Sequence, residues 1–202
     1  MAAAHKRRLT FPALTLLLCG AAVVVFSAPI LSGALIYDRV AITQGEWWRL
    51  VTGNLVHYSA AHLVYDLLAF SITGTLIEQQ HRPHLGLLVL LAASLIGAVL
   101  WFVHPELRYY GGLSGVATAA VVYLCLGGLN VRGAWRWVCI AALAALALKM
   151  GYESVTGESL TGQGGLQQSF IPVPYAHVAG ALGALLLCGF FALARRVTAN
   201  RR

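Results

Sequence analysis

The residues whose types and spacing could support hydrolytic chemistry lie at the starts of apolar segments. Ser114 is part of the sequence GGLSG at 111–115, and His177 stands one turn before Gly180 in a later segment. A serine hydroxyl becomes a nucleophile when a base takes its proton, and an imidazole has a suitable pKa for that role. We therefore predict a Ser114–His177 dyad, which two closely packed helices can hold without a third, acidic member.

A second polar group begins and enters an earlier apolar segment, and consists of His57, His62 and Asp66. His62 and Asp66 are four residues apart and so lie on one face of a helix. A serine at the start of a helix lies beside free backbone N–H groups, which stabilise an oxyanion. We expect an oxyanion site at Ser114 to which His62 adds a side-chain donor.

The segments that must position these residues are those of an integral membrane protein. Of the 202 residues, 59% are hydrophobic and 10% charged, against about 25% charged in soluble domains. Six spans of about 20 residues leave little room for an appended domain. We expect one membrane domain over residues 1–202, with short basic tails at about 1–9 and 195–202.

The pattern of apolar stretches predicts an all-α membrane protein with six transmembrane helices. They lie near residues 10–28, 58–77, 85–103, 112–129, 135–151 and 175–194. The fifth connection, from 152 to 174, is rich in glycine, serine and glutamine. Small residues at Gly115 and Ala119, and again at Gly180 and Ala184, predict a close approach between the fourth and sixth spans.

Charge gives the orientation of the spans. Ten of the 14 lysines and arginines fall in the two termini and the second and fourth connections. The positive-inside rule therefore places both termini in the cytoplasm. His62, Ser114 and His177 then share one depth, in the outer third of the bilayer. The net charge of +7 reflects this topology, since the basic residues form no stripe with aromatics that would indicate nucleic acid.

Four motifs in this order make the sequence resemble the rhomboid family of intramembrane serine proteases. They are Trp48-Arg49 in the first outer connection, HYSAAHLVYD at 57–66, GLSG at 112–115 and AHVAG at 176–180. Together they extend over about residues 45–184. The family's first outer connection is half embedded in the membrane, which suits Trp47 and Trp48 as interfacial anchors.

The resemblance implies a six-helix core with roles for individual residues. Ser114 would be the nucleophile and His177 the general base, while His62 and the Ser114 N–H would hold the oxyanion. The other positions expected to support the site are Asp66, Gly112, Leu113 and Gly115, and those expected to be structural near it are Trp48, Arg49, His57 and Gly180. The resemblance also implies that the substrates are transmembrane proteins and that a gate for substrate and water precedes the sixth span. It implies no cofactor and no metal.

Asp66 departs from the family pattern, which usually has asparagine there. An amide donates a hydrogen bond at any pH, whereas a carboxyl group donates only when protonated. Burial favours the neutral form of a carboxyl group, so Asp66 could serve as a donor. Alternatively, Asp66 orients His62 and leaves the oxyanion to other donors.

The compact chain looks like the rhombosortase branch of the family. Such proteins resemble a sorting protease that cleaves exported proteins at a C-terminal tail made of a Gly-Gly motif, a hydrophobic helix and a basic end. This predicts a multi-pass protein of the bacterial inner membrane whose active site opens to the periplasmic side. The sequence does not predict the oligomeric state.

Two other classes of function remain open at this stage. His57, His62, Asp66 and His177 could bind a metal in an intramembrane hydrolase, although the sequence has no HExxH motif. The chain could also be a non-catalytic rhomboid-like binder of membrane helices. Such a binder should lack the serine or the histidine, and both are present.

Overall fold

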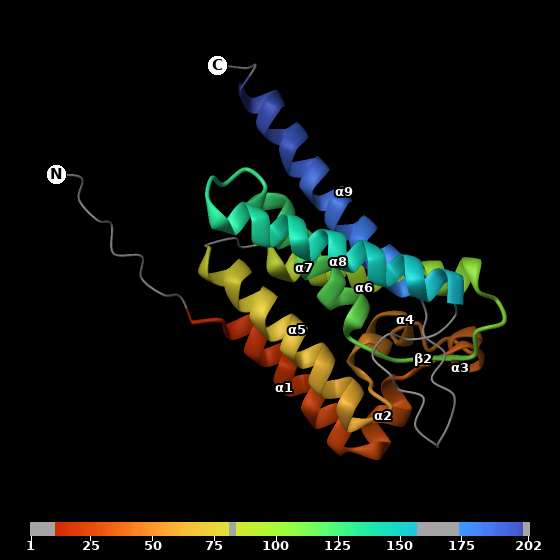
Figure 1. The fold of residues 1–202 in the computed structure, drawn as a ribbon. Helices are drawn as coiled ribbons and strands as arrows, with labels where there is room; N and C mark the ends of the chain where they lie inside the picture. The colour runs from red at the N-terminus through yellow and green to blue at the C-terminus, as the bar shows by residue number, and fades with distance from the viewer. Residues whose placement is uncertain (1–10, 81–83, 157–173, 200–202) are drawn as a thin grey trace.

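The computed structural model describes residues 11–80, 84–156 and 174–199, and within them the chain is mostly helical (Figure 1). Among the described residues, four helices are long and apolar enough to cross a membrane. They are α5 (Ala60–Gln79), α6 (Leu85–Val103), α8 (Ala134–Thr156) and α9 (Pro174–Ala199). The chain is thus a mostly helical membrane protein.

The first apolar segment is broken into two helices. α1 (Ala13–Ser27) and α2 (Pro29–Leu35) are bent by 111° relative to one another, and count as a fifth candidate span if they are taken together. Pro29 is the first residue of α2, a position that proline tolerates because the N–H it lacks has no partner there. A further apolar helix, α7 (Ser114–Gly128), has only 15 residues.

Most predicted spans begin and end within a few residues of the observed helices, but α8 and α9 are longer. α8 continues to Thr156, whereas the predicted fifth span ended at 151 and left Glu153 in a connection. That boundary was wrong because Lys149 and Glu153, four residues apart on one helix face, pair at 2.7 Å and extend the helix. α9 continues to Ala199, so the start of the predicted basic tail at 195–202 is helical.

α7 is buried along nearly its whole length. It contacts α5, α6, α8 and α9, and α1 packs beside α5 at the edge of the bundle (Figure 1). Small residues such as Gly115, Ala117, Ala119 and Ala120 let these neighbours approach closely. The start of α7, where Ser114 lies, is therefore held by surrounding helices.

Short elements fill the connection between α2 and α5. They are β1 (Tyr37–Asp38), α3 (Arg39–Thr43), α4 (Arg49–Thr52) and the 3-10 helix η1 (Gly53–Leu55). α4 packs directly on α6, because a Cβ on Gly97 would overlap the carbonyl oxygen of Leu50. β1 pairs in antiparallel fashion with β2 (Tyr109–Tyr110), which precedes α7. The connection is thus fixed both to α6 and to the segment before Ser114.

Arg49 holds the turn of this connection together. Its side chain is buried and lies 2.6 Å from the carboxylate of Glu46. It also donates to the carbonyl oxygens of Gly33 at 2.7 Å and Ile36 at 2.9 Å. Trp48, which is exposed, donates its indole N–H to Ala34 O at 3.2 Å. Both residues of the predicted motif therefore join α4 to the segment after α1.

We expect Arg49→Met to destabilise the protein by about 2 kcal/mol, because Gly33 O, Ile36 O and the Glu46 carboxylate lose a charged hydrogen-bond donor. Unfolding in detergent, followed by circular dichroism, measures the change. Arg132→Met is the matched control, since Arg132 is exposed, and should leave the unfolding midpoint within error. Equal midpoints for the two variants would contradict this role of Arg49.

Candidate active site

The turn before Ser114 requires glycine. Gly112 has a φ of +146°, a conformation that residues with a side chain rarely adopt. A Cβ on Gly112 would also lie 2.9 Å from Cε1 and 3.0 Å from Nε2 of His62. The absence of a side chain at Gly112 thus lets the turn lie against the His62 imidazole.

Backbone pairing with the first connection fixes this turn. Tyr37 of β1 pairs with Tyr110 of β2. The N–H of Gly112 donates to Gly53 O at 3.3 Å. The hydroxyl of Tyr110 donates to Gly112 O at 3.1 Å. The long connection between α2 and α5 therefore helps to set the position at which α7 begins with Ser114.

The seam between α7 and α9 is in direct backbone contact. A Cβ on Gly180 would overlap the carbonyl oxygen of Gly115, and a Cβ on Gly115 would lie 2.8 Å from Ala176 O. Ala119 and Ala184 are both fully buried. The close approach predicted from the spacing of these small residues is confirmed.

The seam brings Ser114 and His177 together. Nε2 of His177 lies 3.0 Å from Oγ of Ser114. His177 is 7% exposed, while Ser114 is partly exposed. A serine, a base at hydrogen-bond distance and a helix N-terminus thus meet in one place, which is the arrangement that nucleophilic catalysis requires.

A third residue, which the sequence interpretation missed, lies on the other side of His177. Oε2 of Glu153 is 3.1 Å from Nδ1 of His177. Glu153 is 1% exposed, and its Oε1 accepts from Nζ of Lys149 at 2.7 Å. The sequence signal that could have found it is the Lys149–Glu153 spacing, which adds a turn to the predicted fifth span.

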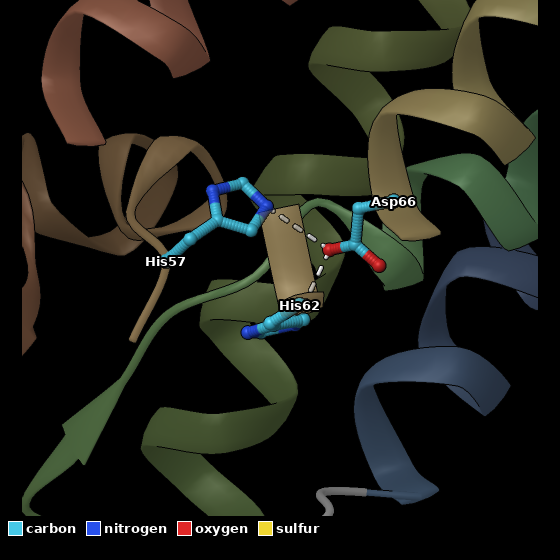
Figure 2. A group of neighbouring side chains, drawn as sticks. All are labelled: His57, His62 and Asp66. Atoms are coloured by element: carbon cyan, nitrogen blue, oxygen red, sulfur yellow. Dashed lines mark hydrogen bonds and ion pairs between the residues drawn. The ribbon is translucent and has the colours of Figure 1, made fainter. Parts of the chain in front are cut away.

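His57, His62 and Asp66 form a second cluster, shown in Figure 2. A single oxygen, Oδ2 of Asp66, lies 3.1 Å from Nε2 of His57 and 3.3 Å from Nε2 of His62. The two imidazoles meet edge to face with centroids 4.9 Å apart. All three side chains are buried. Asp66 thus bridges both histidines.

The same cluster contacts the turn before Ser114. The N–H of Leu113 points at Nε2 of His57, 3.4 Å away, and the same nitrogen faces Oδ2 of Asp66. On its other side, Nδ1 of His57 lies 3.2 Å from Leu55 O. The imidazole of His57 therefore links the backbone of η1 to that of the GLSG motif, while His62 packs against Gly112.

The four residues considered as metal ligands do not form one group. Ligand atoms of His57, His62 and Asp66 lie within 4.8 Å of one another, and that group does not include His177. The ring nitrogens of His177 face Ser114 and Glu153 instead. A metal site that needs all four would require His177 to leave both of these neighbours.

Comparison of the sequence with known proteins identifies a family. A family model for the rhomboid domain matches residues 44–194. The chain belongs to the rhomboid family. The match includes both clusters as well as Trp48 and Arg49.

Three relatives of this rhomboid chain are bacterial proteins named as rhomboid proteases. It is 30% identical to GluP of Bacillus subtilis over 167 residues, which cover 79% of this chain and 32% of GluP. It is 27% identical to AarA of Providencia stuartii over 218 residues, with 87% of this chain and 76% of AarA covered. GlpG of Pectobacterium atrosepticum is 28% identical over 148 residues, with 71% and 48% covered. The chain thus spans about a third of GluP and about half of GlpG.

Proposed function

We propose that this rhomboid chain is an intramembrane serine endopeptidase that cleaves transmembrane proteins, with Ser114 as nucleophile and His177 as general base. The observation that carries the proposal is the 3.0 Å distance between Ser114 Oγ and His177 Nε2. The tight α7–α9 seam holds the two side chains at this distance. The names of the bacterial relatives as rhomboid proteases support the same activity.

The reaction proceeds in two halves. Nε2 of His177 takes the proton of Ser114 as Oγ attacks the scissile carbonyl carbon, forming a tetrahedral oxyanion. The C–N bond then breaks, and His177 returns the proton to the leaving amine. In the second half, His177 takes a proton from water, whose oxygen attacks the acyl-enzyme ester. The ester bond breaks, Ser114 regains its proton, and the new carboxylate is released.

The oxyanion is held at the start of α7. The N–H of Leu113 is directed at His57, so the backbone donor there is the N–H of Ser114, at the helix N-terminus. His62, packed against Gly112, is the side-chain group beside the same turn. We assign Asp66 the orienting role, because its Oδ2 contacts both imidazoles.

Asp66→Asn should retain kcat within about 3-fold, because an amide oxygen can stand where Oδ2 does between the two histidines. Asp66→Leu removes that oxygen and should lower kcat by about 10- to 100-fold, because a small misplacement of a catalytic group is costly in rate. Initial rates on a transmembrane reporter measure both. Full activity of Asp66→Leu would exclude an orienting role, and equal losses would show that the negative charge itself is needed.

The length of α7 gives the site its depth. Six spans follow if the α1–α2 pair and α7 are counted with the four long helices, with both termini cytoplasmic by the distribution of lysine and arginine. At 1.5 Å per residue the 15 residues of α7 span about 22 Å, less than the roughly 30 Å hydrocarbon core. Ser114 would then lie below the outer surface, and water must reach it from that side.

The substrate is an exported protein with a C-terminal transmembrane helix, and the location is the bacterial inner membrane. A helix in lipid satisfies its own backbone hydrogen bonds, so the scissile bond becomes accessible only where the helix unwinds. Glycine makes unwinding easier, which favours the Gly-Gly sorting tails of the rhombosortase branch.

Reconstituted protein and two reporters test this function. We expect cleavage of a reporter that ends in Gly-Gly, a hydrophobic helix and basic residues, and at least 10-fold slower cleavage when Gly-Gly is replaced by Leu-Leu. EDTA should leave the rate unchanged, whereas a metal-dependent hydrolase would be inhibited. Equal rates on both reporters would exclude the Gly-Gly preference while leaving the protease activity in place.

A further inference from the structure

Glu153 is a buried carboxylate that has no role in the proposed Ser114–His177 dyad. It lies on α8, whose only buried residues are Cys139 and Glu153. The burial of a charged group is costly unless the group is paired. A buried carboxylate on a helix that has so few buried residues therefore indicates a specific partner.

That partner is His177. Oε2 of Glu153 and Nδ1 of His177 are 3.1 Å apart. Both atoms are buried, and among the described residues neither makes a fully aligned hydrogen bond with any group. Oε2 of Glu153 and Nδ1 of His177 are thus each other's available hydrogen-bond partners. A small rotation of the imidazole would align the Nδ1–H with Oε2.

Lys149 decides which carboxylate oxygen faces His177. Its Nζ donates to Oε1 at 2.7 Å, one turn before Glu153 on the same helix. Oε1 is therefore occupied and Oε2 is left for Nδ1 of His177. The four groups form a chain from Lys149 through Glu153 and His177 to Ser114.

We propose that Glu153 is a positioning residue for His177 and makes the proposed dyad a Ser-His-Glu arrangement. It accepts the Nδ1–H of His177, so the lone pair of Nε2 faces the Ser114 hydroxyl. It also stabilises the imidazolium that forms when His177 takes the serine proton. This inference rests on the proposed function.

Glu153→Gln tests the tautomer directly. Lys149 will keep the amide oxygen, so the amide NH₂ will face Nδ1 and make it an acceptor. The proton then moves to Nε2, where it blocks base catalysis. We expect kcat to fall about 100-fold with KM within about 2-fold. The amount of folded protein is measured by absorbance after size-exclusion chromatography, so that kcat is expressed per folded molecule.

The double variant Lys149→Met with Glu153→Gln separates positioning from mere packing. Without Lys149 the amide can rotate and present its oxygen to Nδ1, so about 10-fold of the lost kcat should return. A structural role predicts no such recovery. Glu78→Gln is the matched control, because Glu78 accepts from the backbone N–H groups of Leu14 and Thr15 at the start of α1; its kcat should be unchanged.

Histidine ¹⁵N NMR of the unmodified protein tests the proposal without any variant that could misfold at Glu153. The signals of His177, assigned by their loss in His177→Gln, should show Nδ1 protonated. Protonation at Nε2 instead, full kcat in Glu153→Gln, or no recovery in the double variant would each overturn the proposal. If Ser114→Ala is inactive while Glu153→Gln is fully active, only this inference fails; if Ser114→Ala cleaves normally, the proposed function itself fails.

Discussion

Replacing Ser114 or His177 by alanine is expected to lower the cleavage rate by about 10⁴-fold or more, to the background of the assay. The double replacement should be little worse than either single change, because the two groups act as one unit across the 3.0 Å contact. Ser114→Ala should keep the stability of the parent, since Ser114 is only partly buried and alanine is well tolerated in a helix. His177→Ala should lower the unfolding midpoint, because it leaves the buried Glu153 carboxylate without the imidazole. Reconstituted protein and a transmembrane reporter give the rates.

A serine and a histidine away from the site, Ser27 and His84, serve as matched controls for these changes. Ser27 is exposed at the end of α1, where its hydroxyl donates to Val23 O. His84 stacks on Phe191 of α9 at a centroid distance of 4.1 Å. Ser27→Ala and His84→Ala should keep the wild-type rate within about 2-fold. Loss of cleavage in these controls, or its survival in Ser114→Ala, would contradict the assignment.

The second large effect is expected from Gly180→Ala. The new methyl group would overlap the carbonyl oxygen of Gly115, so α7 and α9 must move apart. Overpacking of this kind costs about 1 to 3 kcal/mol. The same movement separates Ser114 from His177, and a misplacement of about 1 Å costs about 100-fold in rate. We expect both a lower unfolding midpoint and a kcat reduced by about that factor.

Gly189→Ala on the same helix is the matched control. A Cβ at Gly189 meets nothing within 4 Å, and alanine has the higher helix propensity. This variant should be as stable as the parent or slightly more so, with unchanged kcat. If Gly180→Ala behaved like Gly189→Ala, the tight seam could not be what sets the dyad distance.

The membrane-spanning helices and both residues of the pair were predictable from local sequence. Long apolar runs mark spans because each must satisfy its own backbone groups in lipid. Small residues four apart, at Gly115 and Ala119, indicate a close helix contact because they let two backbones approach. The predicted spans and the predicted α7–α9 contact follow from such local patterns.

Other features depended on contacts between distant segments. The elements between α2 and α5 are positioned by the pairing of Tyr37 with Tyr110 and by the contact of Leu50 with Gly97. Hydrophobic periodicity in the sequence does not predict these contacts. Glu153 was missed for a different reason: its charge suggested a connection, whereas Lys149 on the same face makes it acceptable within a helix. The bridging of His57 and His62 by Asp66 likewise needed the fold.

The most direct test of the central claim is to treat the detergent-solubilised protein with a fluorophosphonate and locate the adduct by mass spectrometry. A serine activated by His177 should carry the adduct at Ser114, and labelling should disappear in His177→Ala, where Ser114 is still present. Labelling at another residue, or undiminished labelling of Ser114 without His177, would contradict a dyad formed between α7 and α9.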